Sequence, residues 1–149
     1  MRTVLTVLAA LVVLAAFAVV PAGAVQAAKV GPCVAPSNRD YVPYTPDDLQ
    51  HGPTRVDNAF AVRVSNVKSY TAARFVGGEA DGKIGTWGVS APQPGVGGPA
   101  FGLDRNARRW SIQGLDLRLG VIARNFGLRA SDPAAKKARQ CVRDAAAGR

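Results

Sequence analysis

The sequence is poor in the residues that most often perform catalysis or hold metal ions. Its 149 residues include one histidine, two cysteines and ten acidic residues, of which only Glu79 is a glutamate. A zinc site needs several Cys or His ligands at close spacing, and the sequence contains no Cys-x-x-Cys pair. We therefore expect no metal site and no cofactor.

Catalytic motifs are equally scarce. The segment GVSAP at 88–92 lacks the second glycine of the nucleophile elbow Gly-x-Ser-x-Gly. Glycoside cleavage needs two carboxylates that face a cleft, whereas the pairs at 47–48 and 79–81 stand in expected caps and turns. We assign no catalytic residue and expect that the protein is not an enzyme.

One alternative, a small secreted hydrolase, centres on His51. Asp47 lies four residues before it, so the two side chains can meet on one face of a short helix. His51 would then serve as the general base. The other explanation is a solvent-exposed histidine that ends a short helix beside Gly52.

The amino terminus has the layout of a secretory signal peptide. A positive Arg2 is followed by an unbroken apolar run over 7–20, and small residues appear after Pro21. These small residues predict cleavage after Ala24 or Ala27, which makes residues 1–27 the signal peptide.

We expect the remaining residues, 28–149, to form a single mature domain, since their number suits one hydrophobic core. The protein would be secreted, free or associated with the cell envelope. An uncleaved membrane anchor is the alternative, because the apolar run over 4–20 reaches the short limit of about 17–25 residues for a membrane span.

Cys33 and Cys141 allow one pairing only. In an exported protein such a pair predicts a single structural disulfide, which would tie the start of the mature domain to its last helix. Two unpaired buried thiols are the alternative.

Positive charge is concentrated in the last third of the chain. Residues 25–99 hold 7 basic and 6 acidic side chains, whereas residues 100–149 hold 11 basic and 4 acidic ones. Outside a cell, this excess favours an anionic envelope polymer, a phospholipid surface or an acidic protein as partner, and not cytoplasmic nucleic acid. The alternative explanation is the residue usage of a GC-rich bacterial genome.

Residue patterns predict an α+β fold that begins with a sheet. Period-two alternation of β-branched residues predicts a small antiparallel sheet over roughly 55–91, with a glycine-rich hairpin loop at 77–82. A helix over 57–75 is the alternative. The Pro/Gly-rich segment 91–102 predicts an irregular loop.

Two helices are expected after this loop. The first covers roughly 112–126, although the alternating leucines within it also fit a strand. The second covers roughly 132–146, where Ser131, Asp132 and Pro133 form a typical helix start.

The basic C-terminal region supports the main functional hypothesis, a non-enzymatic binding protein that turns a basic helical face toward an anionic surface or partner. The planar guanidinium group of arginine suits phosphate and carboxylate groups, to which it can donate two hydrogen bonds. A neighbouring tryptophan would stack on a sugar or lie in a membrane interface. The candidate binding residues are Arg108, Arg109, Trp110, Lys136, Lys137, Arg139 and Arg143. A buried tryptophan among ordinary exposed arginines, and an enzyme inhibitor that inserts the loop 91–102, remain alternatives.

Overall fold

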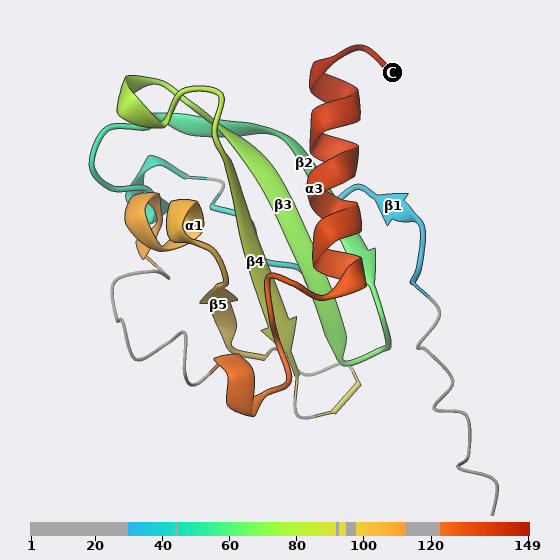
Figure 1. Cartoon of the computed structure of the whole chain (residues 1–149). Helices are drawn as coiled ribbons and strands as arrows, with labels where there is room; N and C mark the ends of the chain where they lie inside the picture. Colours follow the sequence, from blue (N-terminus) through green and yellow to red (C-terminus); the bar gives the residue numbers. More distant parts are fainter. Residues whose placement is uncertain (1–29, 44, 92, 95–97, 113–122) are drawn as a thin grey trace, which may run out of the picture.

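The structure is a computed structural model that describes residues 30–43, 45–91, 93–94, 98–112 and 123–149. The expected signal peptide lies outside this part of the chain. A five-stranded antiparallel sheet of order β1-β2-β3-β4-β5 forms its centre (Figure 1). The strands are β1 (Cys33–Val34), β2 (Arg55–Arg63), β3 (Lys68–Val76), β4 (Ile84–Ser90) and β5 (Ala100–Gly102). The predicted α+β class and sheet are confirmed, and the alternative helix over 57–75 is excluded.

Hairpins join the three long strands. The β2–β3 register runs from Arg55 opposite Val76 to Arg63 opposite Ser69, with a bulge where Asn58 adopts a positive φ of 48°. Asparagine tolerates this left-handed conformation better than most residues. The predicted glycine-rich loop joins β3 to β4 and contains the short helix η2 (Gly78–Ala80).

Strand β5 occupies the end of the segment 91–102 that was expected to be irregular. Its three residues pair with Trp87–Val89 of β4. No local pattern in a Pro/Gly-rich segment indicates such a strand, because the partner that stabilises it is supplied by the tertiary structure.

Two α-helices and a further short 3-10 helix have their full bounds within the described chain. They are α1 (Arg105–Trp110), α3 (Pro133–Ala146) and η1 (Pro46–Asp48). Helix α3 confirms the expected helix over 132–146. Of the expected helix over 112–126, residues 113–122 lie outside the described part and residues 123–125 are helical. Helix α1 was not predicted, although Asp104 caps it by accepting a hydrogen bond from the backbone N–H of Ala107 at 2.9 Å.

The sheet separates two hydrophobic cores, and α3 covers one of its faces (Figure 1). Successive residues of a strand point to opposite faces. In β4, Thr86 accepts a hydrogen bond from Arg139 of α3, whereas Trp87 lies in the other core with Trp110 of α1. Helices α1 and α3 therefore pack on opposite faces. The N-terminal arm, residues 35–43, packs on the α1 side, where Val42 joins the core and Tyr41 contacts Trp87.

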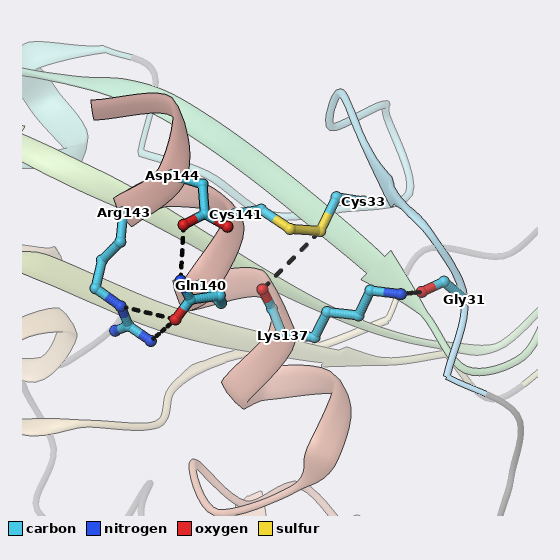
Figure 2. The surroundings of a disulfide bond; sticks show 7 residues. All are labelled: Gly31, Cys33, Lys137, Gln140, Cys141, Arg143 and Asp144. Atoms are coloured by element: carbon cyan, nitrogen blue, oxygen red, sulfur yellow. Dashed lines mark hydrogen bonds between the residues drawn. A yellow bond between two sulfur atoms is a disulfide. The ribbon is translucent and has the colours of Figure 1, made fainter. Parts of the chain in front are cut away.

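The predicted disulfide joins Cys33 of β1 to Cys141 of α3, with their Cα atoms 6.6 Å apart (Figure 2). Close by, the Nζ of Lys137 donates a hydrogen bond to the carbonyl of Gly31 at 2.7 Å. One covalent bond and one charge-assisted hydrogen bond thus hold the edge of the sheet to α3.

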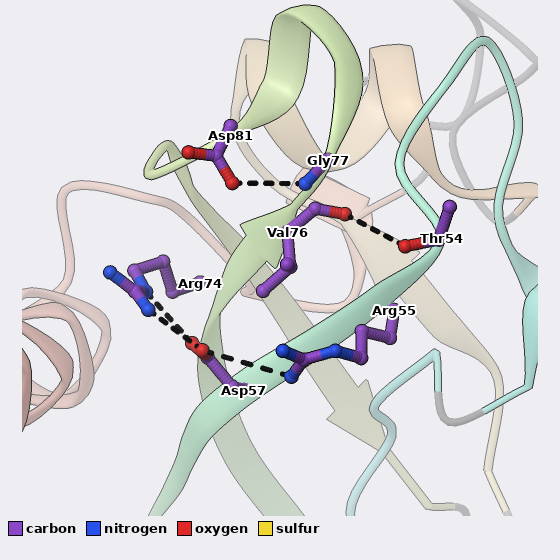
Figure 3. Close-up of polar contacts among 7 residues, drawn as sticks. All are labelled: Thr54, Arg55, Asp57, Arg74, Val76, Gly77 and Asp81. Atoms are coloured by element: carbon purple, nitrogen blue, oxygen red, sulfur yellow. Dashed lines mark hydrogen bonds and ion pairs between the residues drawn. The ribbon is translucent and has the colours of Figure 1, made fainter.

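A cluster of polar contacts lies where β2 meets the end of β3 (Figure 3). Asp57 accepts two hydrogen bonds of 2.8 Å from Arg74, and Arg55 lies 3.9 Å from the same carboxylate. The hydrogen bonds from Arg74 lower the pKa of Asp57. Exposed ion pairs of this kind contribute about 0–1 kcal/mol to the free energy of unfolding. We therefore assign these residues a modest role in stability and no role in binding.

Candidate functional site

The structure divides the seven predicted binding residues between two helices. Arg108, Arg109 and Trp110 belong to α1, whereas Lys136, Lys137, Arg139 and Arg143 belong to α3. Because the two helices cover opposite faces of the sheet, a flat anionic surface contacts only one group at a time.

Trp110 is part of the hydrophobic core. Only 3% of the residue is exposed, and its ring packs edge-on against Phe75 with the ring centroids 5.6 Å apart. The Nζ of Lys83 lies 4.9 Å from the centroid of its ring, a cation–π contact. Trp110 therefore does not offer its ring to a ligand.

The two arginines before Trp110 also contact groups of this chain. Arg109 forms a 2.8 Å ion pair with Glu79, and the Nη1 of Arg108 donates to the carbonyl of Leu103 at 3.3 Å. Both arginines of α1 thus already have partners in this chain, although the Arg109–Glu79 pair is exposed.

The α3 group presents more of its charge to solvent. Lys136 and Arg143 are exposed on the outer face, with Arg143 held by Gln140 at 2.8 Å (Figure 2). The only carboxylate of the helix, Asp144, accepts a hydrogen bond from Gln140 and lies 3.3 Å from Arg149.

The other two cations of α3 are half-buried and help to hold the fold. Lys137 donates to the carbonyl of Gly31, as described above. Arg139 donates to the carbonyl of Ala130 at 2.8 Å and to the hydroxyl of Thr86 at 3.2 Å. Their charge still adds to the positive potential of this face.

A cleft of about 430 Å³ opens on the opposite side of the sheet, between the N-terminal arm and the β2–β3 turn. Polar side chains from both sides line it. The lining residues are Asn38, Arg39, Asp40, Tyr41, Arg63, Ser65, Asn66, Val67, Lys68, Ser69, Val89, Ala91, Gly98 and Ala100. The amine of Lys68 itself points to the α3 side, where it donates to the carbonyl of Gly127.

A half-buried ion pair between Asp40 and Arg63 holds the arm at this cleft. The Asp40 side chain is fully covered, and its Oδ2 accepts hydrogen bonds from the backbone N–H of Ser37 at 2.9 Å and from Arg63 at 2.8 Å. Burial alone raises the pKa of Asp40, but the hydrogen bonds from Ser37 and Arg63 and the nearby hydroxyl of Ser69 outweigh it and lower the pKa below its usual value. Asp40 is therefore held as a carboxylate.

Unpaired polar atoms are concentrated in the wall of this cleft. In the described part of the chain, five buried side-chain nitrogen or oxygen atoms lack a hydrogen-bond partner, and four belong to lining residues. The four are Asp40 Oδ1, Tyr41 Oη, Arg63 Nε and Ser69 Oγ. The hydroxyl of Ser69 lies beside the Asp40 carboxyl without full hydrogen-bond geometry.

The described residues provide no catalytic partner for His51. Among the described residues no hydrogen bond or ion pair links it to Asp47, and Asp48 instead completes a capping box with Thr45. His51 is exposed and does not line the cleft. Within the same part of the chain, no group of three or more His, Cys, Asp or Glu side chains could hold a metal ion.

The cleft was missed in the sequence because its residues come from four separate segments. The only local signal was the polar run Asn38-Arg39-Asp40 inside a proline-rich arm. Arg63 occupies a strand position that points to the same face as Ser69, but its partner Asp40 lies 23 residues away.

Comparison with known proteins found no match to this chain among family models, curated proteins or solved structures. Within the described residues, no helix has the length and apolar character needed to cross a membrane. What the fold defines is a disulfide-linked α+β protein with two distinct surfaces, a basic helix on one face and a polar cleft on the other.

Proposed function

We propose that this chain is an exported, envelope-associated, non-enzymatic binding protein that contacts an anionic surface through the outer face of α3. The observation that carries the proposal is the charge of this helix. Helix α3 holds four cations and one carboxylate, and that carboxylate lies at its last turn, against Arg149. The outer face therefore keeps its positive charge along the first three turns.

The expected strength follows from this number of cations. A basic side chain near an anionic surface contributes about 1 kcal/mol, so the exposed Lys136 and Arg143 together contribute about 2 kcal/mol, and the half-buried Lys137 and Arg139 add only to the positive potential of this face. Such a contact is weak and reversible. It suits a membrane or polymer that offers many anionic groups, and salt weakens it because the Debye length falls to about 3 Å at 1 M.

The test is co-sedimentation of the purified protein with vesicles of anionic lipid, with neutral vesicles as reference. Replacing Lys136 and Arg143 by glutamine removes about 2 kcal/mol, so we expect affinity for the anionic vesicles to fall about thirtyfold. The matched control replaces Arg105 and Arg109 of α1 by glutamine, which removes the same charge from the opposite face.

We expect the control variant to bind within about threefold of the natural protein, since its two cations face away from the surface. Equal losses in both variants would show that net charge, and not α3, drives the contact. Binding that is unchanged between 0.05 M and 1 M salt would contradict the proposal altogether.

A further inference from the structure

The cleft between the arm and the sheet has the size of a small-molecule site. Its volume of about 430 Å³ lies within the range of about 300–1,000 Å³ that is usual for such sites. It is on the face of the sheet opposite to α3, so a ligand here binds independently of the surface contact proposed above.

The hollow arises from a change in side-chain size along one face of the sheet. Near α1 this face is filled by Phe75 and Trp87, whose ring centroids lie 5.8 Å apart, and Tyr41 of the arm packs edge-on against Trp87 at 6.2 Å. Beyond Tyr41, Arg63 of β2 reaches toward the arm, whereas β3, β5 and the end of β4 present only small side chains to it. These are Ser69, Val89, Ala91 and Ala100. The aromatic side chains thus close one end of the cleft and the small ones leave it open.

The wall of the cleft holds unmet hydrogen-bonding capacity. A buried polar atom without a partner is unfavourable, and most buried polar atoms in native proteins are paired. Here four such atoms gather around one hollow, and the fifth is the Nε1 of Trp110. All four are covered and lie behind the exposed lining residues of the cleft.

The exposed lining determines the chemistry that fits. The amides of Asn38 and Asn66 and the hydroxyl of Ser65 can donate and accept hydrogen bonds, as sugar hydroxyls require. Arg39 is exposed and takes part in no ion pair among the described residues, whereas Arg63 is paired with Asp40.

We propose that this cleft binds an acidic sugar, that is, a hydroxyl-rich ring with one carboxylate or phosphate group. Arg39 holds the acidic group, the amides and Ser65 hold the hydroxyls, and the small apolar side chains of Val89 and Ala91 face the ring. The Asp40–Arg63 pair positions the arm that carries Arg39.

The experiment is an NMR titration of the isotope-labelled protein with glucuronate and with glucose 6-phosphate. We expect saturable shifts of the backbone amides of residues 38–41 and 65–69, with those of α3 unchanged. Glucose lacks the acidic group, so we expect it to bind at least tenfold more weakly than glucuronate or glucose 6-phosphate. Inorganic phosphate lacks the sugar ring, so we expect it also to bind at least tenfold more weakly than glucose 6-phosphate.

Variants locate the site. Arg39→Gln and Asn66→Ala change exposed side chains, so both should fold normally and each should lower the affinity for the best acidic sugar at least tenfold. Lys136→Gln is the matched control and should leave the titration unchanged. A disaccharide ending in glucuronate distinguishes two sources of the ligand: tighter binding than the free acid assigns it to a glycan end, and weaker binding to a free sugar acid.

The proposal is overturned if neither acidic sugar gives saturable shifts, if the shifts map to α3, or if phosphate alone binds as tightly as glucose 6-phosphate. These outcomes are separate from those of the vesicle test. Loss of vesicle binding on replacement of Lys136 and Arg143 leaves the cleft titration intact, and Arg39→Gln should leave vesicle binding within threefold.

Discussion

At the scale of single residues, the contact between Asp40 and Arg63 shows how a buried charge is accommodated. The carboxylate is fully covered while 40% of the Arg63 side chain remains exposed, so the pair is only partly removed from water. A hydrogen bond to a charged group contributes about 1.5–3 kcal/mol to the free energy of unfolding. The arm therefore depends on this carboxylate more than on any exposed ion pair of the fold.

We predict that Asp40→Asn lowers the free energy of unfolding by about 2 kcal/mol at pH 7, measured by urea denaturation. The pKa of Asp40 is lower in the folded than in the unfolded chain, where it is near 3.8. Its stabilisation is thus complete above the unfolded pKa and is lost as pH falls through the folded pKa. The difference between the natural protein and the variant should shrink as pH falls from about 5 to below 3.

The control for this prediction is Asp47→Asn, because Asp47 is exposed and forms no hydrogen bond within the described part of the chain. We expect it to change the free energy of unfolding by less than about 0.5 kcal/mol. A pH dependence that stays the same in the Asp40 variant would show that this carboxyl is not held by the fold.

The roles of single residues were the hardest to predict from sequence. Trp110 follows two arginines, and the sequence left open whether its ring stacks on a ligand or is buried; in the structure the ring fills the core beside Phe75. Lys137 and Arg139 look like ordinary solvent-facing cations, but Lys137 donates to the carbonyl of Gly31 and Arg139 to the hydroxyl of Thr86, both in distant segments. Sequence distance hides these partners, because each contact depends on how helix and sheet pack.

At the scale of elements, the disulfide and α3 act together. The bond links residues separated by 108 positions, so it encloses nearly all of the described chain. Helix α3 also packs through small residues, since Ala134, Ala135 and Ala138 are almost fully buried against the sheet. Small side chains allow close approach but bury little apolar area, which makes the covalent link important for this helix.

We predict that replacing Cys33 and Cys141 by serine lowers the free energy of unfolding by about 4 kcal/mol, as expected for a loop of about 100 residues. The denaturant slope should rise, because the unfolded chain without the bond exposes more surface. Urea denaturation followed by far-UV circular dichroism measures both quantities. Equal stability with and without the bond would contradict this account.

Elements with strong local signals were predicted well. Helix α3 has a proline start and small residues at helical spacing, and β2 to β4 have alternating residues around a glycine-rich turn. The six-residue α1 and three-residue β5 are too short for periodicity to reveal. Their formation depends on the neighbouring strand β4, which each of them contacts.

At the scale of the whole molecule, one sheet serves two hydrophobic cores. Both tryptophans, Trp87 and Trp110, lie in the core on the α1 side, whereas Val142 of α3 lies in the other. The strands between them carry side chains of both cores in alternation, so neither core can open without disturbing the sheet.

We therefore predict that Val142→Ala lowers the free energy of unfolding by about 2 kcal/mol and shifts the tryptophan fluorescence transition as much as the circular dichroism transition. Fluorescence reports on the α1 side, opposite to the mutation. If the fluorescence midpoint stayed in place while the circular dichroism midpoint moved, the two cores would unfold separately.

The sequence by itself predicted the α+β class, an antiparallel sheet over roughly 55–91, helix α3 and the disulfide, while a helix over 57–75 and two unpaired thiols stayed open as alternatives. These predictions depend on the alternation of residues in strands, on helix-capping residues and on the presence of only two cysteines, all of which can be read from the sequence without knowledge of the packing. The tertiary structure decided that the basic residues divide between opposite faces and that an arm and a turn enclose a polar cleft. Those features arise from contacts between distant segments, where the face that a side chain meets depends on packing and not on its neighbours in the chain.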